Sequence, residues 1–197
     1  AWVALVPLLW VLNDVTPSEA FRRGMVFGLS HFVSLLYWLV PTMVTYGHLP
    51  LILSIGILFL FAAVLSLVFI APAICGLSFV GRTPVRILFF FPLFWIGTEF
   101  LRSFLFTGFP WELLGNSQYE QLHLIQLSDI FGVYGISGVL AFANAALLMG
   151  ILAISGQSWR GQPVKLRLAL GSITAALVWV GAAWIYGDLR IAQIDRL

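Results

Sequence analysis

Five long apolar stretches dominate this sequence and limit the folds that are open to it. A helix needs about 20 apolar residues to cross a hydrocarbon core of about 30 Å. Each of the five is long enough, and none alternates with the period of two that is typical of barrel strands. They cover approximately residues 24–46, 49–74, 87–106, 131–155 and 166–187. The pattern therefore predicts an all-α fold, a polytopic transmembrane helix bundle with about five full spans.

A sixth apolar stretch, residues 1–12, is too short to cross a bilayer as a helix. We interpret it as a truncated first helix that begins upstream of this sequence. The composition supports a membrane protein, because 61% of the residues are hydrophobic and only 9% are charged, against about 25% charged residues in soluble domains. This excludes a soluble globular enzyme, a nucleic-acid-binding protein and a disordered chain.

The positions of the basic residues predict the topology of the chain. Membrane proteins concentrate Lys and Arg in cytoplasmic connections. The first, third and fifth connections hold the basic residues Arg22, Arg23, Arg82, Arg86, Arg160, Lys165 and Arg167. The connections at residues 47–50 and 107–130 hold no Lys or Arg. We therefore expect the odd connections to be cytoplasmic and the even ones external, with residues 1–187 as the bundle and 188–197 as the start of an external linker.

Two ionisable residues, Glu99 and Arg102, fall inside the third full-length apolar stretch, residues 87–106. Charges at membrane depth are costly unless they are paired or face a cavity. At positions i and i+3 the two side chains share one helix face, so they can neutralise each other. Two interpretations follow: an ion pair that fixes helix packing, or a site that holds an anionic lipid headgroup.

The external segment, residues 107–130, is too apolar for a solvated loop and too interrupted for a span. Gly108 and Pro110 predict a break in the helix, while Trp111 and Tyr119 are aromatic residues of the kind found at membrane interfaces. We expect the segment to lie in or dip into the outer leaflet. It is either a loop packed on the bundle or a surface that admits an acyl chain, and its candidate lipid-binding residues are Phe109, Trp111 and Tyr119.

Other motifs indicate packing rather than chemistry. Cys75 has no ionisable neighbour in sequence, so we expect a packing role, and the spacing of the three His residues predicts neither a metal site nor a cofactor. Asn144 is expected to form hydrogen bonds across helices. The glycines at 132, 135 and 138 predict close helix packing.

Residues 89–118, FFFPLFWIGTEFLRSFLFTGFPWELLGNSQ, carry a specific resemblance. Together with GVYGIS at 132–137 and TYGHLP at 45–50, they resemble the signature of bacterial apolipoprotein N-acyltransferases. The resemblance implies a multi-pass protein of the bacterial inner membrane. Its partners would be a phospholipid acyl donor, a lipoprotein acceptor and the bilayer, with no nucleic acid.

The family's catalytic Glu-Lys-Cys triad belongs to a periplasmic nitrilase-like domain, which the resemblance places after the last span. Cys75 and Lys165 match no part of the triad motifs, so no catalytic residue is assigned. We expect this chain to supply the lipid-facing platform, with its C-terminal end on the periplasmic side. The alternatives are a stand-alone membrane scaffold that recruits a separately encoded amidase-like subunit, or a transporter, which the scarcity of buried charge disfavours.

Overall fold

The computed structural model describes residues 1–105, 108–194 and 196, and its regular structure is almost entirely helical. The predicted all-α bundle is confirmed. Within the described residues, the helices long and apolar enough to cross a membrane are Leu51–Val80, Pro84–Phe104, Ser128–Ile154 and Leu166–Ile194. A bent pair of helices brings the number of candidate spans from four to five. The chain forms two compact units, one of residues 15–78 and one of residues 1–14 with 79–197.

The bent pair lies in the unit of residues 15–78 and comprises α2 (Pro17–Leu35) and α3 (Leu39–Thr45). A capping box between Thr16 and Glu19 begins α2. The apolar stretch over 24–46 does not form one straight helix, because the two helices differ in direction by 49°. Pro41 explains the break. It has no N–H to donate to the carbonyl of Tyr37, four residues earlier, and its ring clashes with that carbonyl in a regular helix.

The same unit contains α4 (Leu51–Leu65), the π-helical turn η1 (Ser66–Ile70) and α5 (Ala71–Val80), which together form one long span. Two glycines of α2 allow the close approach of this span: a Cβ at Gly28 would lie 2.8 Å from the Ser66 hydroxyl oxygen, and one at Gly24 would lie 3.0 Å from the Ala71 Cα. Cys75 lies on α5 as a half-buried free thiol.

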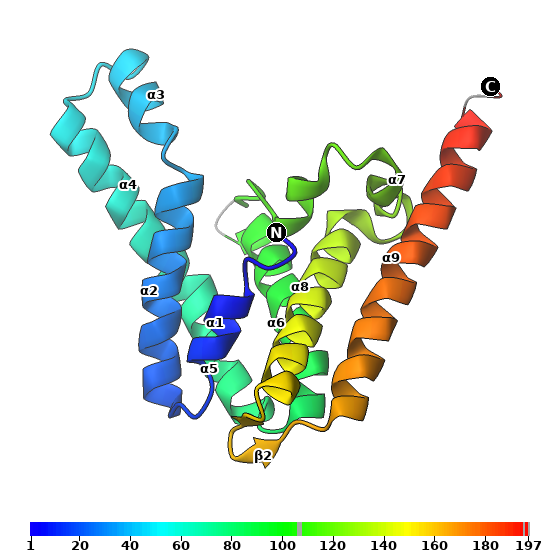
Figure 1. The fold of residues 1–197 in the computed structure, drawn as a ribbon. Coiled ribbons are helices and arrows are strands. Elements are labelled where there is room, and N and C mark those ends of the chain that lie inside the picture. The colour runs from blue at the N-terminus through cyan, green and yellow to red at the C-terminus, as the bar shows by residue number, and fades with distance from the viewer. Residues whose placement is uncertain (106–107, 195, 197) are drawn as a thin grey trace. The chain divides into compact units, whose positions relative to one another are not determined.

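The other unit is built around α8 (Ser128–Ile154), which contacts α1 (Val6–Val11), α6 (Pro84–Phe104) and α9 (Leu166–Ile194) (Figure 1). Of the most apolar 18 residues of α8, 72% are buried, against 17% for α9, so α8 is the central helix. Asn144 of α8 accepts a hydrogen bond from the Leu5 N–H at 2.9 Å and donates to the Ala1 carbonyl at 3.0 Å. The predicted cross-helix role of Asn144 is therefore confirmed.

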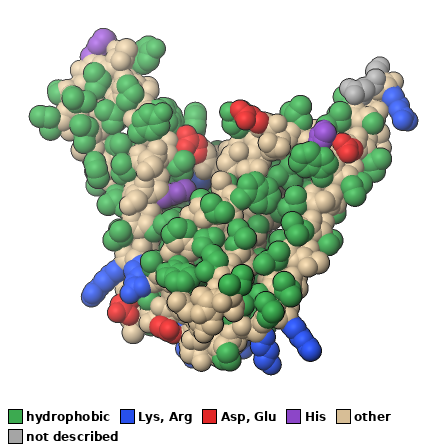
Figure 2. Space-filling model, in the orientation of Figure 1, with side chains coloured by type: hydrophobic (Ala, Val, Ile, Leu, Met, Phe, Trp, Pro, Cys, Tyr) green, Lys and Arg blue, Asp and Glu red, His purple; other side chains and the backbone are tan. Residues whose placement is uncertain are grey.

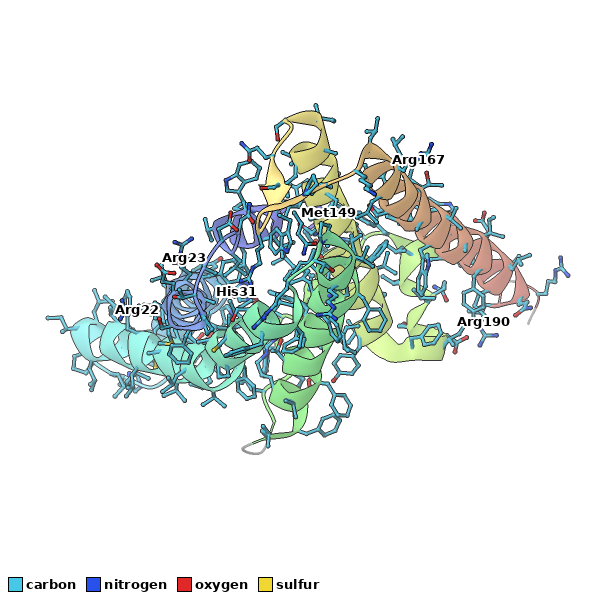
Figure 3. The ribbon with its side chains drawn as sticks, turned by 90° about the horizontal axis from the view of Figure 1, so that it is seen from below. Arg22, Arg23, His31, Met149, Arg167 and Arg190 are labelled. Carbon is cyan, nitrogen blue, oxygen red and sulfur yellow. The ribbon has the colours of Figure 1, made fainter. Side chains whose placement is uncertain are left out.

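A short hairpin of β1 (Ser158–Trp159) and β2 (Gln162–Pro163) connects α8 to α9. The buried Trp159 indole donates to the Gly81 carbonyl at 2.8 Å, just before α6 begins. Lys and Arg side chains lie at this end of α9, and many hydrophobic side chains are exposed along the helices above it (Figure 2). Figure 3 shows Arg167 and Arg190 toward opposite ends of α9.

Candidate functional site

Glu99 and Arg102 lie near the end of α6 and are almost fully buried, with 4% and 5% of their surfaces exposed. Glu99 Oε1 accepts two hydrogen bonds, from the Trp95 indole at 2.9 Å and from the Leu114 N–H at 2.7 Å. The Ser137 hydroxyl of α8 also faces this carboxylate. The other oxygen, Oε2, is buried with no hydrogen-bond partner in the part of the chain that the structure describes. One acidic side chain therefore joins α6 to the external segment.

Arg102 holds the same segment at a second point. Its guanidinium donates to the Trp111 carbonyl at 2.8 Å, and its own carbonyl accepts from the Phe109 N–H at 2.7 Å. Arg102 is also attracted by the charges of Glu99 and Glu112. The two charges therefore attract each other, and both also anchor the backbone of the external segment. This anchoring role was not part of either interpretation that the sequence left open.

A third anchor comes from the short 3-10 helix η3 (Leu114–Gln118). The Gly115 N–H donates to the Ser137 hydroxyl of α8 at 2.8 Å. A Cβ on Gly115 would lie 2.6 Å from the Val133 carbonyl oxygen, so only glycine allows this approach. Sequence reasoning did not identify Ser137 as an anchor, although it falls within the GVYGIS motif that carried the resemblance.

The conformation of the external segment depends on backbone turns with positive φ. Gly108 has φ of +85°, and a Cβ there would collide with the Ser103 carbonyl oxygen. Glu112 also adopts a positive φ, of 52°. Phe106 and Thr107, which belong to the predicted signature, lie outside the described residues.

The structure brings four of the five candidate lipid-binding residues together. Phe109 and Trp111 have ring centroids 6.4 Å apart and are adjacent to Arg102 through the backbone hydrogen bonds described above. The Trp111 side chain is exposed, and that of Phe109 is half-buried. We name Glu99, Arg102, Phe109 and Trp111 the anchor site.

Tyr119 is not joined to the anchor site by any hydrogen bond among the described residues. Its hydroxyl donates to Glu120 at 2.9 Å, and this hydrogen bond raises the pKa of the exposed phenol. The ring is exposed. Tyr119 can therefore contact lipid only as part of the outer surface of the segment.

The far end of the external segment is fastened to α9. Helix α7 (Leu122–Ile125) places Leu124 in a buried apolar cluster with Ala183 of α9. Asp129 accepts from Tyr186 at 2.9 Å and pairs with Arg190 at 2.9 Å. Helix α9 continues to Ile194, beyond the end of the apolar stretch expected at Gly187. Residues 188–194 mix polar and apolar residues and include good helix formers. No group of three or more His, Cys, Asp or Glu residues in the described ranges could hold a metal ion.

Comparison with known proteins agrees with the signature. A family model described as the apolipoprotein N-acyltransferase N-terminal domain matches residues 1–146. The chain is 40% identical over 97% of its length to the apolipoprotein N-acyltransferase of Geobacter metallireducens, covering 35% of that protein. It is 36% identical over 74% of its length to the enzyme of Methylococcus capsulatus, covering 29% of it. The chain thus spans about a third of the length of these curated relatives.

Proposed function

This chain belongs to the apolipoprotein N-acyltransferase family, and we propose that it forms the membrane platform of an enzyme that transfers an acyl chain from a phospholipid to the N-terminal cysteine of a lipoprotein. The observation that carries the proposal is the anchor site. A solvent-side segment with exposed aromatic residues is fixed to the membrane helices by two buried charges. Such an arrangement suits a surface at which an amphipathic substrate is held, because an aromatic ring contacts acyl chains while its polar edge meets headgroups.

The proposed site is rigid because its anchors are strong. Hydrogen bonds that involve a charged group stabilise by about 1.5–3 kcal/mol, roughly twice as much as neutral ones. Glu99 and Arg102 provide such bonds to Leu114 and Trp111, on either side of Glu112. A pre-ordered segment loses less conformational freedom when it binds a substrate, and this favours affinity.

We place the platform in the bacterial inner membrane, with the external segment and the C-terminal end of α9 on the periplasmic side. The distribution of charge supports this orientation. The connection at the hairpin end of α9 contains Arg160, Lys165 and Arg167, whereas the external segment contains Glu112, Glu120 and Asp129 and no Lys or Arg.

In this proposal the acyl-transfer chemistry belongs to a nitrilase-like region that the longer relatives would supply. Covalent catalysis by a thiol requires a neighbouring base or a positive field that favours the thiolate. Cys75 lies on a transmembrane helix with an apolar sequence around it, AICGLS. The residues of this chain would then position the phospholipid and the lipoprotein.

A thioester assay tests whether the acyl-transfer chemistry belongs to the nitrilase-like region and not to this chain. The chain, reconstituted with a phospholipid labelled in its acyl chain, is compared with a fusion in which the remaining sequence of the Geobacter metallireducens relative follows it. Only the fusion is expected to form a hydroxylamine-sensitive acyl-thioester. A labelled thioester on the chain alone, lost in Cys75→Ser, would overturn the proposal.

A further inference from the structure

Basic residues from separate segments meet at the hairpin end of the unit formed by residues 1–14 and 79–197, opposite to α7 (Figure 1). Residues 13–14, 81–86 and 158–167 contain five basic side chains against the single acidic side chain of Asp14. Arg82 precedes the first turn of α6, whereas Arg102 of the anchor site lies in its last turn. At 1.5 Å per residue the two arginines are about 30 Å apart along the helix. The basic residues are Arg82, Arg86, Arg160, Lys165 and Arg167.

A buried hydrogen bond brings Arg160 close to Arg82. The Trp159 indole donates to the Gly81 carbonyl at 2.8 Å, and the two arginines are the next residues along the two joined segments. The pKa of Arg160 is lowered, chiefly by partial burial of its guanidinium; Asp14 opposes this shift, and the like charge of Arg82 adds to it. An anionic group between the two arginines would replace their repulsion by attraction.

The turn that carries Arg160 is not one that its backbone favours. Arg160 and Gly161 connect the paired residues Trp159 and Gln162, and their φ angles are 49° and 73°. Positive φ at both positions is typical of a type I′ turn, in which Asn, Asp or Gly normally comes first. The Asn13 side chain supports the turn by accepting from the Arg160 N–H at 2.7 Å. The choice of arginine at this position therefore points to a role for its guanidinium.

The chemistry and the depth of this cluster indicate its ligand. A guanidinium presents a planar set of N–H donors that matches the oxygens of a phosphate. The hairpin lies in the connection between the spans α8 and α9, and Arg82 lies two residues before the span α6. The headgroup layer extends roughly 5–7 Å beyond the hydrocarbon core on each side. Residues so close to the ends of spans meet the phosphates of lipid headgroups, and basic sites between membrane helices bind them.

We propose that Arg82 and Arg160 bind the phosphate of an anionic phospholipid in the leaflet next to the hairpin, with Lys165 adding to the positive field. A lipid such as phosphatidylglycerol keeps its net negative charge at this site. A zwitterionic lipid carries in addition an ammonium group, which the arginines repel. The site is at the other end of α6 from the anchor site, so it is independent of the acyl-transfer function.

Native mass spectrometry of the chain in detergent tests the site, with phosphatidylglycerol and phosphatidylcholine added in equal amounts. Both lipids carry the phosphate, and they differ in net charge. Phosphatidylglycerol adducts are expected to exceed phosphatidylcholine adducts several-fold. The double variant Arg82→Gln, Arg160→Gln should abolish this preference. The matched control, Arg22→Gln with Arg23→Gln, removes two positive charges from exposed arginines of another connection and should retain it.

The single variant Arg82→Gln guards against misfolding of the double variant, because Arg82 is exposed, and circular dichroism identifies the variants that keep their helices. It should lower the preference at least twofold, and an unchanged preference in the folded variant would overturn the proposal. Equal losses in the double variant and in the matched control would show attraction by overall charge, with the same consequence. Displacement of phosphatidylglycerol by millimolar glycerol 3-phosphate would show a site for soluble phosphates and overturn the assignment to lipid.

Discussion

Glu99 connects its own helix to the external segment, through the Trp95 indole and the Leu114 N–H. Its partner Arg102 is equally buried and depends on that negative charge. A buried charge that loses its compensating partner destabilises a protein strongly. The two residues are therefore expected to respond to substitution as a coupled pair.

Replacing Glu99 by Leu should destabilise the chain by about 3–5 kcal/mol, because Arg102 is left as an uncompensated buried charge. Glu99→Gln should cost less, since the amide oxygen can still accept from the Leu114 N–H. The thermal midpoint in detergent reports both effects. Glu120→Gln, on the exposed surface, is the control and should leave the midpoint unchanged. A wild-type midpoint for Glu99→Leu would refute the anchoring role.

Gly108→Ala should destabilise the external segment by about 1–3 kcal/mol, because alanine is strained at φ of +85° and its Cβ would meet the Ser103 carbonyl. Limited proteolysis between residues 108 and 118 measures the effect as faster cleavage. Gly56→Ala is the matched control: a Cβ there meets nothing within 4 Å, and alanine favours the helix. Equal cleavage rates for the two variants would contradict this explanation.

The sequence alone predicted the burial of Glu99, because a charge within an apolar span must be paired or face a cavity. It could not predict the partners of Glu99 and Arg102. The Trp111 carbonyl and the Leu114 N–H are backbone groups, and they reach the charges only through the turn at Glu112, whose positive φ no residue preference indicates. Tyr119 looked equivalent to Trp111 in sequence, yet its hydroxyl bonds to Glu120.

Among the elements, the break between α2 and α3 shows how a single residue redirects a helix. Apolar character continues across residues 36–38, and so hydropathy predicted one span over 24–46. Pro41 was the residue in the sequence that could have indicated the break. A proline disturbs a helix about one turn before its own position, because it cannot donate to the carbonyl four residues earlier. At the end of α9, hydropathy placed the end of the apolar stretch at Gly187, whereas the helix itself continues to Ile194.

Pro41→Ala should straighten the α2–α3 pair, because alanine restores the missing N–H and removes the ring. Spin labels at positions 26 and 46, both exposed, measure the change as a longer distance in a Cys75→Ser background. Pro17→Ala is the control, since Pro17 occupies the first turn of α2, where no helical hydrogen bond is lost. An unchanged distance in Pro41→Ala would show that another feature bends the pair.

At the scale of the whole molecule, the positions of the basic residues in the sequence predict which connections lie on the cytoplasmic side. The number of spans, their approximate bounds and the family followed from hydropathy and the signature, because the requirements of a bilayer are simple and apply to each segment separately. The proximity of Arg160 to Arg82 was not predicted. The basic residues indicated topology, but which of them lie close together depends on how the hairpin packs against the segment before α6.

The predicted sidedness can be tested with single cysteines in a Cys75→Ser background. A cysteine at the exposed Ser117 should react with an impermeant maleimide added outside intact cells. A cysteine at the exposed Gln162, in the hairpin, should react only after the membrane is permeabilised. Labelling of both positions from the same side would contradict the proposed topology.

The burial of Glu99 also has a consequence for how the chain is made. Synthesis runs from the N-terminus, so Glu99 and Arg102 leave the ribosome before Leu114, whose N–H later donates to the carboxylate. During that interval the two charges near the end of α6 have each other, at i and i+3, and the Trp95 indole of the same helix for compensation. We expect α6 to enter the membrane shallowly and to reach its final depth when α8 follows. The close spacing of the two charges would thus ease insertion before it supports the finished structure.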